Sequence, residues 1–188
     1  GIIQARIDSS RLERKMISKI GNHKIIEWVI LRCKKSLKLD NLILATSNER
    51  VDDPLIKIAH ELDIDTFRGE KRNVINRVLE AAKYFNADKI VRICADNPFI
   101  DPEVIDDLVL YHETSKNDLD FNHSPKLNCK IADGLGAEIF SLKLLLDISN
   151  LSLTNSQKEH VTKYIWDNYR NYGDPPITVK SFNSWSNR

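Results

Sequence analysis

A short polar segment near the start of the chain holds a dense set of cations and hydroxyl groups. Its members are Arg6, Ser9, Ser10, Arg11, Arg14 and Lys15. Proteins bind a triphosphate with forked guanidinium groups, a compact ammonium and backbone N–H groups, and a turn that leaves a strand supplies the last of these. The residue types therefore indicate a triphosphate site, although a solvated basic loop would have the same composition.

Asp96 is the candidate for holding a metal ion. It follows the strand-like segment 87–95 and precedes Pro98, so we expect its carboxylate to be fixed where a strand ends. Mg²⁺ binds one or two carboxylates together with phosphate oxygens. The alternative is that Asp96 only caps the turn before Pro98. Asp101 stands directly before Pro102, which predicts a helix N-cap and not a ligand.

Three further side chains have both a functional and a structural interpretation. Arg77 lies outside the apolar stripe of its expected helix, so it either enters a ligand pocket or is solvated. Thr46 either bonds the base or ribose of a nucleotide or simply ends a strand. His160 is either a general base, because histidine titrates near neutral pH, or a structural residue of a helix.

The charges of the chain are unevenly distributed. The 188 residues are 41% hydrophobic and carry a net charge of +1, which suits one domain. Residues 1–40 hold ten Lys or Arg and four Asp or Glu, whereas residues 96–120 hold one and eight. A basic start suits a polyanion and an acidic middle suits a hard cation, but two solvated faces would give the same pattern.

We expect a cytoplasmic protein without a membrane or nucleic-acid partner. No apolar run approaches the roughly 18 residues of a membrane helix, and no signal-peptide pattern is visible. Cys33, Cys94 and Cys129 are too widely spaced for a disulfide framework or a metal site, which favours reduced thiols. The first residues read as a strand already under way, so we expect residues 1–188 to form one domain that is a fragment of a longer chain.

Strand-like and helix-like segments alternate along the first half of the chain. Strands are expected at 2–5, 41–46, 65–68 and 87–95, and helices at 24–38, 52–62, 73–85 and 101–114. This alternation predicts an α/β protein, a three-layer αβα fold with a mainly parallel Rossmann-like sheet. The second half is expected to contain a polar loop over 115–133, a strand at 137–140, helices at 142–148 and 157–169, and a strand at 177–182.

Ligands of open α/β sheets bind at the carboxyl ends of the strands. The basic segment follows the first expected strand, Thr46 ends the second, Gly69 follows the third and Asp96 follows the fourth. We therefore expect these four loops to converge on one site.

Several segments resemble motifs of the cytidylyltransferase family, which includes the enzymes that make CMP-Kdo and CMP-sialic acids. Residues 3–15 are similar to Q-A-R-x-x-S-[ST]-R-L-P-x-K, the opening pattern of the branch named spore coat polysaccharide biosynthesis protein F. Further similar segments follow in the family's order at 44–47, 67–69, 74–77, 91–102, 133–140 and 159–165. Glu13 and Arg14 depart from the pattern, because Pro and Gly are usual there.

The resemblance implies a sheet of the nucleotide-diphospho-sugar transferase type and a Mg²⁺-dependent enzyme. Such an enzyme uses CTP to convert an acidic sugar into a CMP-sugar and pyrophosphate for cell-surface polysaccharide synthesis. The resemblance implies catalytic roles for Arg6, Lys15 and Asp96, with Asp96 as the metal ligand. The implied nucleotide-binding residues are Gln4, Ala5, Arg6, Ser9, Ser10, Arg11, Lys15, Thr46, Arg77 and Asp96. The implied sugar-binding residues are Arg92, Asn97, Glu138 and His160. Members of the family are often dimers, so a homodimer with 115–133 as its contact arm is also expected.

Two departures from the family's pattern leave other functions open. Gly136 stands where the family has Asp in G-L-D-V-E, and nothing in 177–188 matches the family's C-terminal D-x-P-x-D stretch with a second metal ligand. A non-catalytic nucleotide-binding homologue is therefore one alternative. A glycosyltransferase that uses a nucleotide-sugar is another, but its D-x-D metal motif has no match after a strand, since Asp63-Ile64-Asp65 precedes one.

Overall fold

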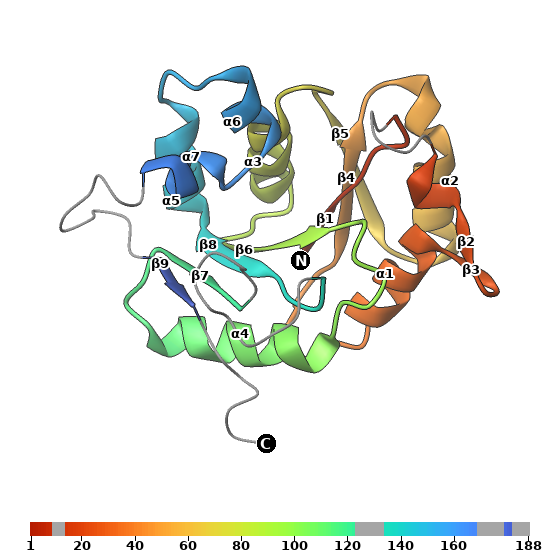
Figure 1. The fold of residues 1–188 in the computed structure, drawn as a ribbon, viewed down its shortest axis with the longest axis horizontal. Helices are drawn as coiled ribbons and strands as arrows, with labels where there is room; N and C mark the ends of the chain where they lie inside the picture. The colour runs from red at the N-terminus through yellow and green to blue at the C-terminus, as the bar shows by residue number, and fades with distance from the viewer. Residues whose placement is uncertain (9–13, 123–133, 169–178, 182–188) are drawn as a thin grey trace.

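A seven-stranded sheet forms the centre of the protein. Figure 1 shows it in a computed structural model of the chain, in which residues 1–8, 14–122, 134–168 and 179–181 are described. The strands run in the order β5-β4-β1-β6-β8-β7-β9. They are β1 (Ile2–Gln4), β4 (Ile43–Ser47), β5 (Asp65–Gly69), β6 (Lys89–Cys94), β7 (Leu119–Phe121), β8 (Glu138–Ser141) and β9 (Val179–Ser181).

Helices cover both faces of the sheet, which confirms the expected three layers (Figure 1). One face carries α1 (Ile25–Cys33), α2 (Asp53–Glu61) and α4 (Pro102–Thr114). The other carries α3 (Val74–Tyr84), α5 (Leu142–Ser149), and the short α6 (Asn155–Glu159) and α7 (Lys163–Asn168). Successive strand residues point to opposite faces, so Ile3 packs in the core under α1, α2 and α4 while Ile2 packs under α3 and α5. None of the described helices is both long and apolar enough to cross a membrane.

The strands that carry the predicted site are parallel neighbours. β5, β4, β1 and β6 are paired in parallel, with Ile3 between Leu44 and Ile93, so their carboxyl ends meet at one edge of the sheet. β8 runs antiparallel between β6 and β7, and β9 pairs in parallel with β7. The mainly parallel Rossmann-like sheet is therefore confirmed.

Side-chain caps fix where several helices begin. Asp101 accepts a hydrogen bond from the backbone N–H of Glu103 at 2.9 Å and Pro102 opens α4, so the predicted N-cap is confirmed. Asn73 caps α3 through the N–H of Asn76. Thr154 caps α6 in a capping box with Gln157.

Two expectations about individual elements were wrong, and one stretch without an expected element proved to contain three. The segment 115–133, expected to be a polar loop, contains the buried strand β7. The central residue of β7, Asp120, interrupts the apolar pattern of the strand. Its carboxylate can be buried because it is hydrogen-bonded to His112. The helix expected at 157–169 is split into α6 and α7, since His160 takes an extended conformation with φ −112°. A 3-10 turn η1 (Lys15–Ile17) and the hairpin of β2 (Lys19–Ile20) and β3 (His23–Lys24) follow the basic segment, where no element was expected. A second 3-10 turn, η2 (Arg50–Asp52), precedes α2.

Candidate active site

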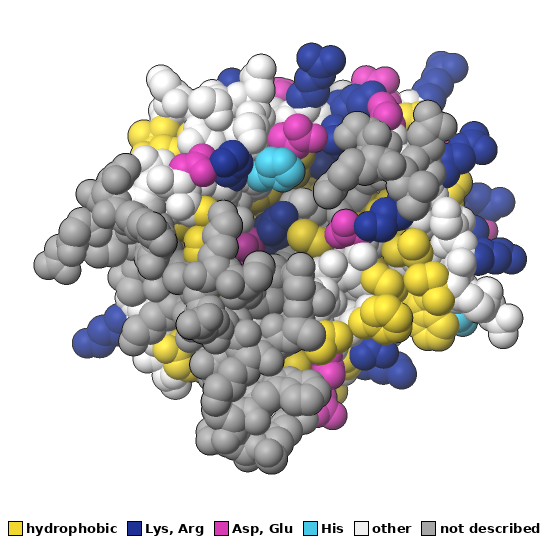
Figure 2. All heavy atoms as spheres, viewed as in Figure 1, with side chains coloured by type: hydrophobic (Ala, Val, Ile, Leu, Met, Phe, Trp, Pro, Cys, Tyr) yellow, Lys and Arg dark blue, Asp and Glu magenta, His cyan; other side chains and the backbone are white. Residues whose placement is uncertain are grey.

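A cavity of about 590 Å³ opens at the carboxyl ends of β1 and β6, beside α3 and the end of α6. Its lining consists of Gln4, Ala5, Arg6, Asp8, Met16, Val74, Arg77, Cys94, Ala95, Asp96, Glu159 and His160. Figure 2 shows basic and acidic side chains gathered around a hollow on this face of the molecule. The predicted site residues that line the cavity are Gln4, Ala5, Arg6, Arg77, Asp96 and His160.

Arg6 joins the start of the chain to α6. Its Nη2 donates to Glu159 Oε1 at 2.6 Å, and its Nη1 donates to the carbonyl of Lys71 at 3.4 Å. The Arg6 side chain is 26% exposed and that of Glu159 is 45% exposed, so both groups can be reached by a ligand. Glu159 is therefore ion-paired with Arg6, the cation that was predicted to hold phosphate.

Lys15 and Asp96, both predicted to be catalytic, form an ion pair with each other. Lys15 Nζ lies 3.1 Å from Asp96 Oδ2, and neither side chain is buried. The pair links η1, just after the basic segment, to the loop that follows β6. The structure thus brings the predicted phosphate cation and the predicted metal ligand together across 81 residues of sequence.

Asp8 and Lys71 form a third ion pair at the cavity, which the sequence analysis missed. Lys71 Nζ lies 2.6 Å from Asp8 Oδ2. The hydrogen bond from Lys71 lowers the pKa of the Asp8 carboxyl, and the same bond raises the pKa of Lys71. Lys71 lies in the loop between β5 and α3, one of the four loops expected to converge, and this position was the signal that could have found it.

Arg77 is buried against the loop that precedes its helix, so the alternative of a solvated Arg77 is wrong. It is 2% exposed, and its Nη1 donates to the carbonyls of Glu70 at 2.8 Å and Lys71 at 3.3 Å. Burial lowers the pKa of Arg77 to about 10, and the nearby positive charge of Arg6 contributes to the same shift to a smaller extent. A Cβ at Gly69 would lie 2.9 Å from Arg77 Cγ, so the packing of the Arg77 stem against the end of β5 requires glycine there.

Asp52 holds the segment that leaves β1, a role that the sequence analysis missed. The carboxylate is 1% exposed, accepts a hydrogen bond from the Ile7 backbone N–H at 2.7 Å, and is also bonded by the Ser47 hydroxyl. It therefore ties the start of the basic segment 6–15, which is predicted to hold phosphate and is here named the phosphate segment, to the end of β4. Its place at the start of the helix expected at 52–62 suggested only a helix terminus.

Arg14 adopts a left-handed backbone with φ +58°. This is the position where the family's pattern has glycine, which enters that region without steric cost. The departure noted in the sequence is therefore a locally strained position at the end of the phosphate segment. Ser9, Ser10 and Arg11 lie outside the described residues.

The remaining predicted residues do not line the cavity. Arg92 and Glu138, predicted to bind sugar, form a pair with Nη1 of Arg92 at 2.6 Å from Oε2 of Glu138. Thr46 is fully buried, and its hydroxyl has no hydrogen-bond partner among the described residues. Asn97 forms the turn after β6, with its N–H bonded to the carbonyl of Cys94. The ligand-binding roles of these residues stay predictions.

The carboxylates of the cavity fit a Mg²⁺ ion only in combination with a ligand. Within the described part of the chain, no group of three or more His, Cys, Asp or Glu side chains could hold a metal. Asp96 and Asp8 both line the cavity. Mg²⁺ commonly keeps one or two carboxylates and takes phosphate oxygens as its other ligands, so this donor set suits a metal that arrives with a triphosphate.

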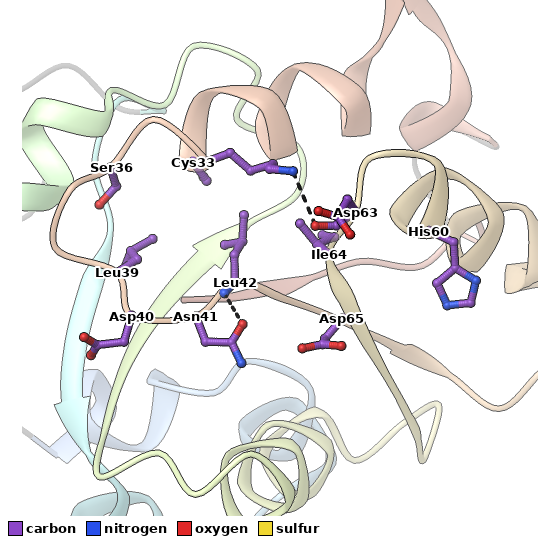
Figure 3. A pocket seen from close by; sticks show the side chains of 11 residues that line it. Cys33, Ser36, Leu39, Asp40, Asn41, Leu42, His60, Asp63, Ile64 and Asp65 are labelled. Atoms are coloured by element: carbon purple, nitrogen blue, oxygen red, sulfur yellow. Dashed lines mark hydrogen bonds between the residues drawn. The ribbon is translucent and has the colours of Figure 1, made fainter.

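A second cavity of about 590 Å³ lies at the opposite end of the parallel strands (Figure 3). Asn41 and Leu42 precede β4, while Asp63 and Ile64 precede β5, and all four line this cavity. Nearby, Lys34 Nζ donates to the carbonyl of Leu62 at 2.6 Å. Because ligands of open α/β sheets bind at the carboxyl ends, the first cavity is the candidate active site.

The sequence profile of the cytidylyltransferase family matches residues 1–183. The chain belongs to the cytidylyltransferase family. This assignment agrees with the resemblance seen in the sequence motifs.

Similar proteins include enzymes and proteins of polysaccharide synthesis. The spore coat polysaccharide biosynthesis protein SpsF of Bacillus subtilis is 32% identical over 169 residues, which cover 87% of this chain and 68% of SpsF. A 3-deoxy-manno-octulosonate cytidylyltransferase of Fusobacterium nucleatum is 40% identical over 121 residues, 64% of this chain and 47% of that enzyme. The structure of a cytidylyltransferase from Leptospira borgpetersenii superimposes with a TM-score of 0.87 at 28% identity, covering 98% of this chain and 75% of the other.

Proposed function

We propose that this protein transfers a cytidylyl group from CTP to an acidic sugar, giving a CMP-sugar and pyrophosphate for cell-surface polysaccharide synthesis. The observation that carries the proposal is the meeting of Arg6, Lys15 and Asp96 at the carboxyl ends of β1 and β6. A metal-bound triphosphate requires cations for its phosphate oxygens and a carboxylate for the metal. The similarity to a 3-deoxy-manno-octulosonate cytidylyltransferase supports an acidic sugar as the acceptor.

In this proposal, a sugar oxygen attacks the α-phosphorus of CTP, the bond to the bridging oxygen breaks, and pyrophosphate leaves. Arg6 and Lys15 hold the outer phosphates, and Arg77 contributes a fixed positive charge at the α3 side of the cavity. Mg²⁺, when bound at Asp96, would neutralise charge on the phosphate oxygens. The residues of the chain act mainly by positioning and by stabilising charge.

The sugar side of the proposed site is formed by α6 and the residue after it. His160 is exposed, caps the end of α6 and lines the cavity together with Glu159. An imidazole at this position can accept a proton from the attacking hydroxyl. Arg92, Asn97 and Glu138 complete the proposed sugar-binding set, with Arg92 and Glu138 acting from behind the cavity wall.

Three further properties belong to the same proposal: Mg²⁺ as the metal, a homodimer, and a cytoplasmic location. The free thiol of Cys33, among the described residues, supports a reducing compartment. Sedimentation of the purified chain tests the dimer, and a monomer across the working concentration range would contradict it.

The decisive test is a pyrophosphate-release assay on the full chain with CTP, Mg²⁺ and a panel of acidic sugars that includes 3-deoxy-manno-octulosonate. We expect release that depends on both the sugar and CTP, and no release by Asp96→Asn, which keeps the shape of the side chain but removes its charge. CTP binding without release for any sugar would reject the transfer reaction and favour a non-catalytic nucleotide-binding protein.

A further inference from the structure

We propose that Gln4 is a hydrogen-bond donor fixed toward the bound ligand, and that Arg92 is the positioning residue that fixes it. The proposal rests on the proposed function, because it describes how the same cavity recognises its ligand. It gives Arg92 and Glu138 a role behind the cavity wall instead of direct contact with the sugar.

Strand register places the three side chains in one row. Gln4 on β1 and Arg92 on β6 lie two register positions apart, since Ile2 pairs with Arg92 and Gln4 with Cys94. Glu138 on β8 pairs directly with Arg92. These side chains project from the sheet face that α3, α5 and α6 cover, because the alternate residue Ile93 packs on the opposite face. The row therefore begins at the cavity, with Gln4 on β1, and runs across β6 to β8.

The chemistry of arginine fixes which end of the Gln4 amide faces it. Arg92 Nε donates to Gln4 Oε1 at 3.1 Å. A guanidinium has five N–H donors and no acceptor, so only the oxygen of the amide can be bonded to it. The Gln4 NH₂ group must then point elsewhere. Gln4 lines the cavity, and no described residue accepts a hydrogen bond from its NH₂ group.

Arg92 is itself held in place on its other side. Its Nη1 donates to Glu138 Oε2 at 2.6 Å, and the Thr162 hydroxyl lies 3.1 Å from both oxygens of Glu138. The Arg92 side chain is 11% exposed and that of Glu138 is 5% exposed. Turning Arg92 away would leave a buried carboxylate without its cation, which is strongly unfavourable. A flipped Gln4 amide would set its NH₂ group against the Arg92 Nε–H, and Arg92 cannot turn away from it without breaking this buried ion pair.

A fixed NH₂ group in the cavity selects a hydrogen-bond acceptor on the ligand. The base of CTP offers a ring nitrogen and a carbonyl oxygen, and an acidic sugar offers a carboxylate. Both sources present the same acceptor chemistry to Gln4, and the two can be separated by measuring nucleotide binding and sugar kinetics independently.

The experiment compares three changes in the full chain. Gln4→Met keeps the length of the side chain but removes the donor. The double change Arg92→Gln with Glu138→Gln removes both buried charges and lets the Gln4 amide flip. Arg92→Lys keeps a donor-only group and the ion pair, so it is the conservative rescue. CTP affinity is measured by titration calorimetry, the KM for 3-deoxy-manno-octulosonate by pyrophosphate release, and the unfolding midpoint by thermal denaturation.

We expect Gln4→Met and the double variant to weaken one ligand by about tenfold, the size of one lost hydrogen bond, with Arg92→Lys close to wild type. Weaker CTP binding identifies the base as the acceptor, and a raised KM with unchanged CTP affinity identifies the sugar. Unchanged values for both ligands in Gln4→Met, or in a folded double variant, overturn the inference alone. Failure of the wild-type chain to bind CTP overturns the proposed function and this inference together.

Discussion

At the residue scale, two cations at the cavity, Arg6 and Lys15, are already paired with acids of the same cavity. Glu159 holds Arg6 at 2.6 Å and Asp96 holds Lys15 at 3.1 Å. A triphosphate competes with these carboxylates for the same donors, so its binding is an exchange of partners. Because these side chains are partly exposed, the affinity for the triphosphate is expected to fall as ionic strength rises.

Lys15→Ala is expected to weaken CTP binding by at least about tenfold, because a charge-assisted contact to phosphate is lost and Asp96 is left without its cation. Titration calorimetry with and without Mg²⁺ measures the effect. Lys19→Ala is the matched control, since it removes the same charge from an exposed residue of β2. Equal affinities in the two variants would contradict the assignment of Lys15 to the phosphates.

Glu159→Gln is expected to tighten CTP binding about two- to fivefold. The change removes the carboxylate that competes for Arg6, and exposed ion pairs of this kind contribute up to about 1 kcal/mol. Glu80→Gln is the control, because Glu80 forms an exposed pair with Lys83. Weaker binding in Glu159→Gln would show instead that Glu159 itself contacts the ligand.

At the element scale, the phosphate segment depends on the end of β4 for its position. Asp52, at the start of α2, bonds the N–H of Ile7 and the hydroxyl of Ser47. The parallel pairing of β1 with β4 brings these groups together, and a buried carboxylate with such partners is shielded from water. The first turn beyond β1 is therefore set by tertiary contacts and not by its own sequence alone.

Asp52→Ala is expected to lower the free energy of unfolding by about 3 kcal/mol, because it removes charge-assisted hydrogen bonds and leaves the buried Ile7 N–H unsatisfied. Urea denaturation followed by circular dichroism measures it. Asp53→Ala should cost under about 1 kcal/mol, since the Asp53 side chain is 55% exposed in its pair with Arg68. Similar losses in the two variants would mean that Asp52 does not anchor the segment.

At the scale of the whole molecule, the cavity is assembled from both halves of the chain. Residues of β1, η1 and the loop after β6 meet Glu159 and His160, which lie at the end of α6. A ligand that bridges these parts binds the folded state and not the unfolded chain. Its binding must therefore stabilise the whole fold.

Saturating CTP is expected to raise the free energy of unfolding by about 2.7 kcal/mol at a ligand concentration of one hundred times Kd. Thermal unfolding at a series of CTP concentrations measures the shift. Lys15→Ala should show a smaller shift at the same CTP concentration. An unfolding midpoint that does not move with CTP would argue that the nucleotide does not bind this cavity.

The sequence predicted the parts of the fold that depend on local pattern. The alternation of apolar strands and amphipathic helices predicted the parallel sheet, and Asp101 before Pro102 predicted the start of α4. It failed at β7, because Asp120 interrupts the apolar pattern and is stabilised there by partners on α4 and in the preceding loop. It also failed at His160, where the chain turns between two short helices.

The sequence by itself determined which chemical groups are available: the cations of the phosphate segment, the carboxylate of Asp96 and the family to which the chain belongs. Only the tertiary structure decided how they pair. Lys15 meets Asp96, Lys71 meets Asp8, and Arg92, which does not line the cavity, is bonded to Gln4, which does. The physical reason is that strand order and register bring distant residues within hydrogen-bond distance, and neither is written in the spacing of residues along the chain.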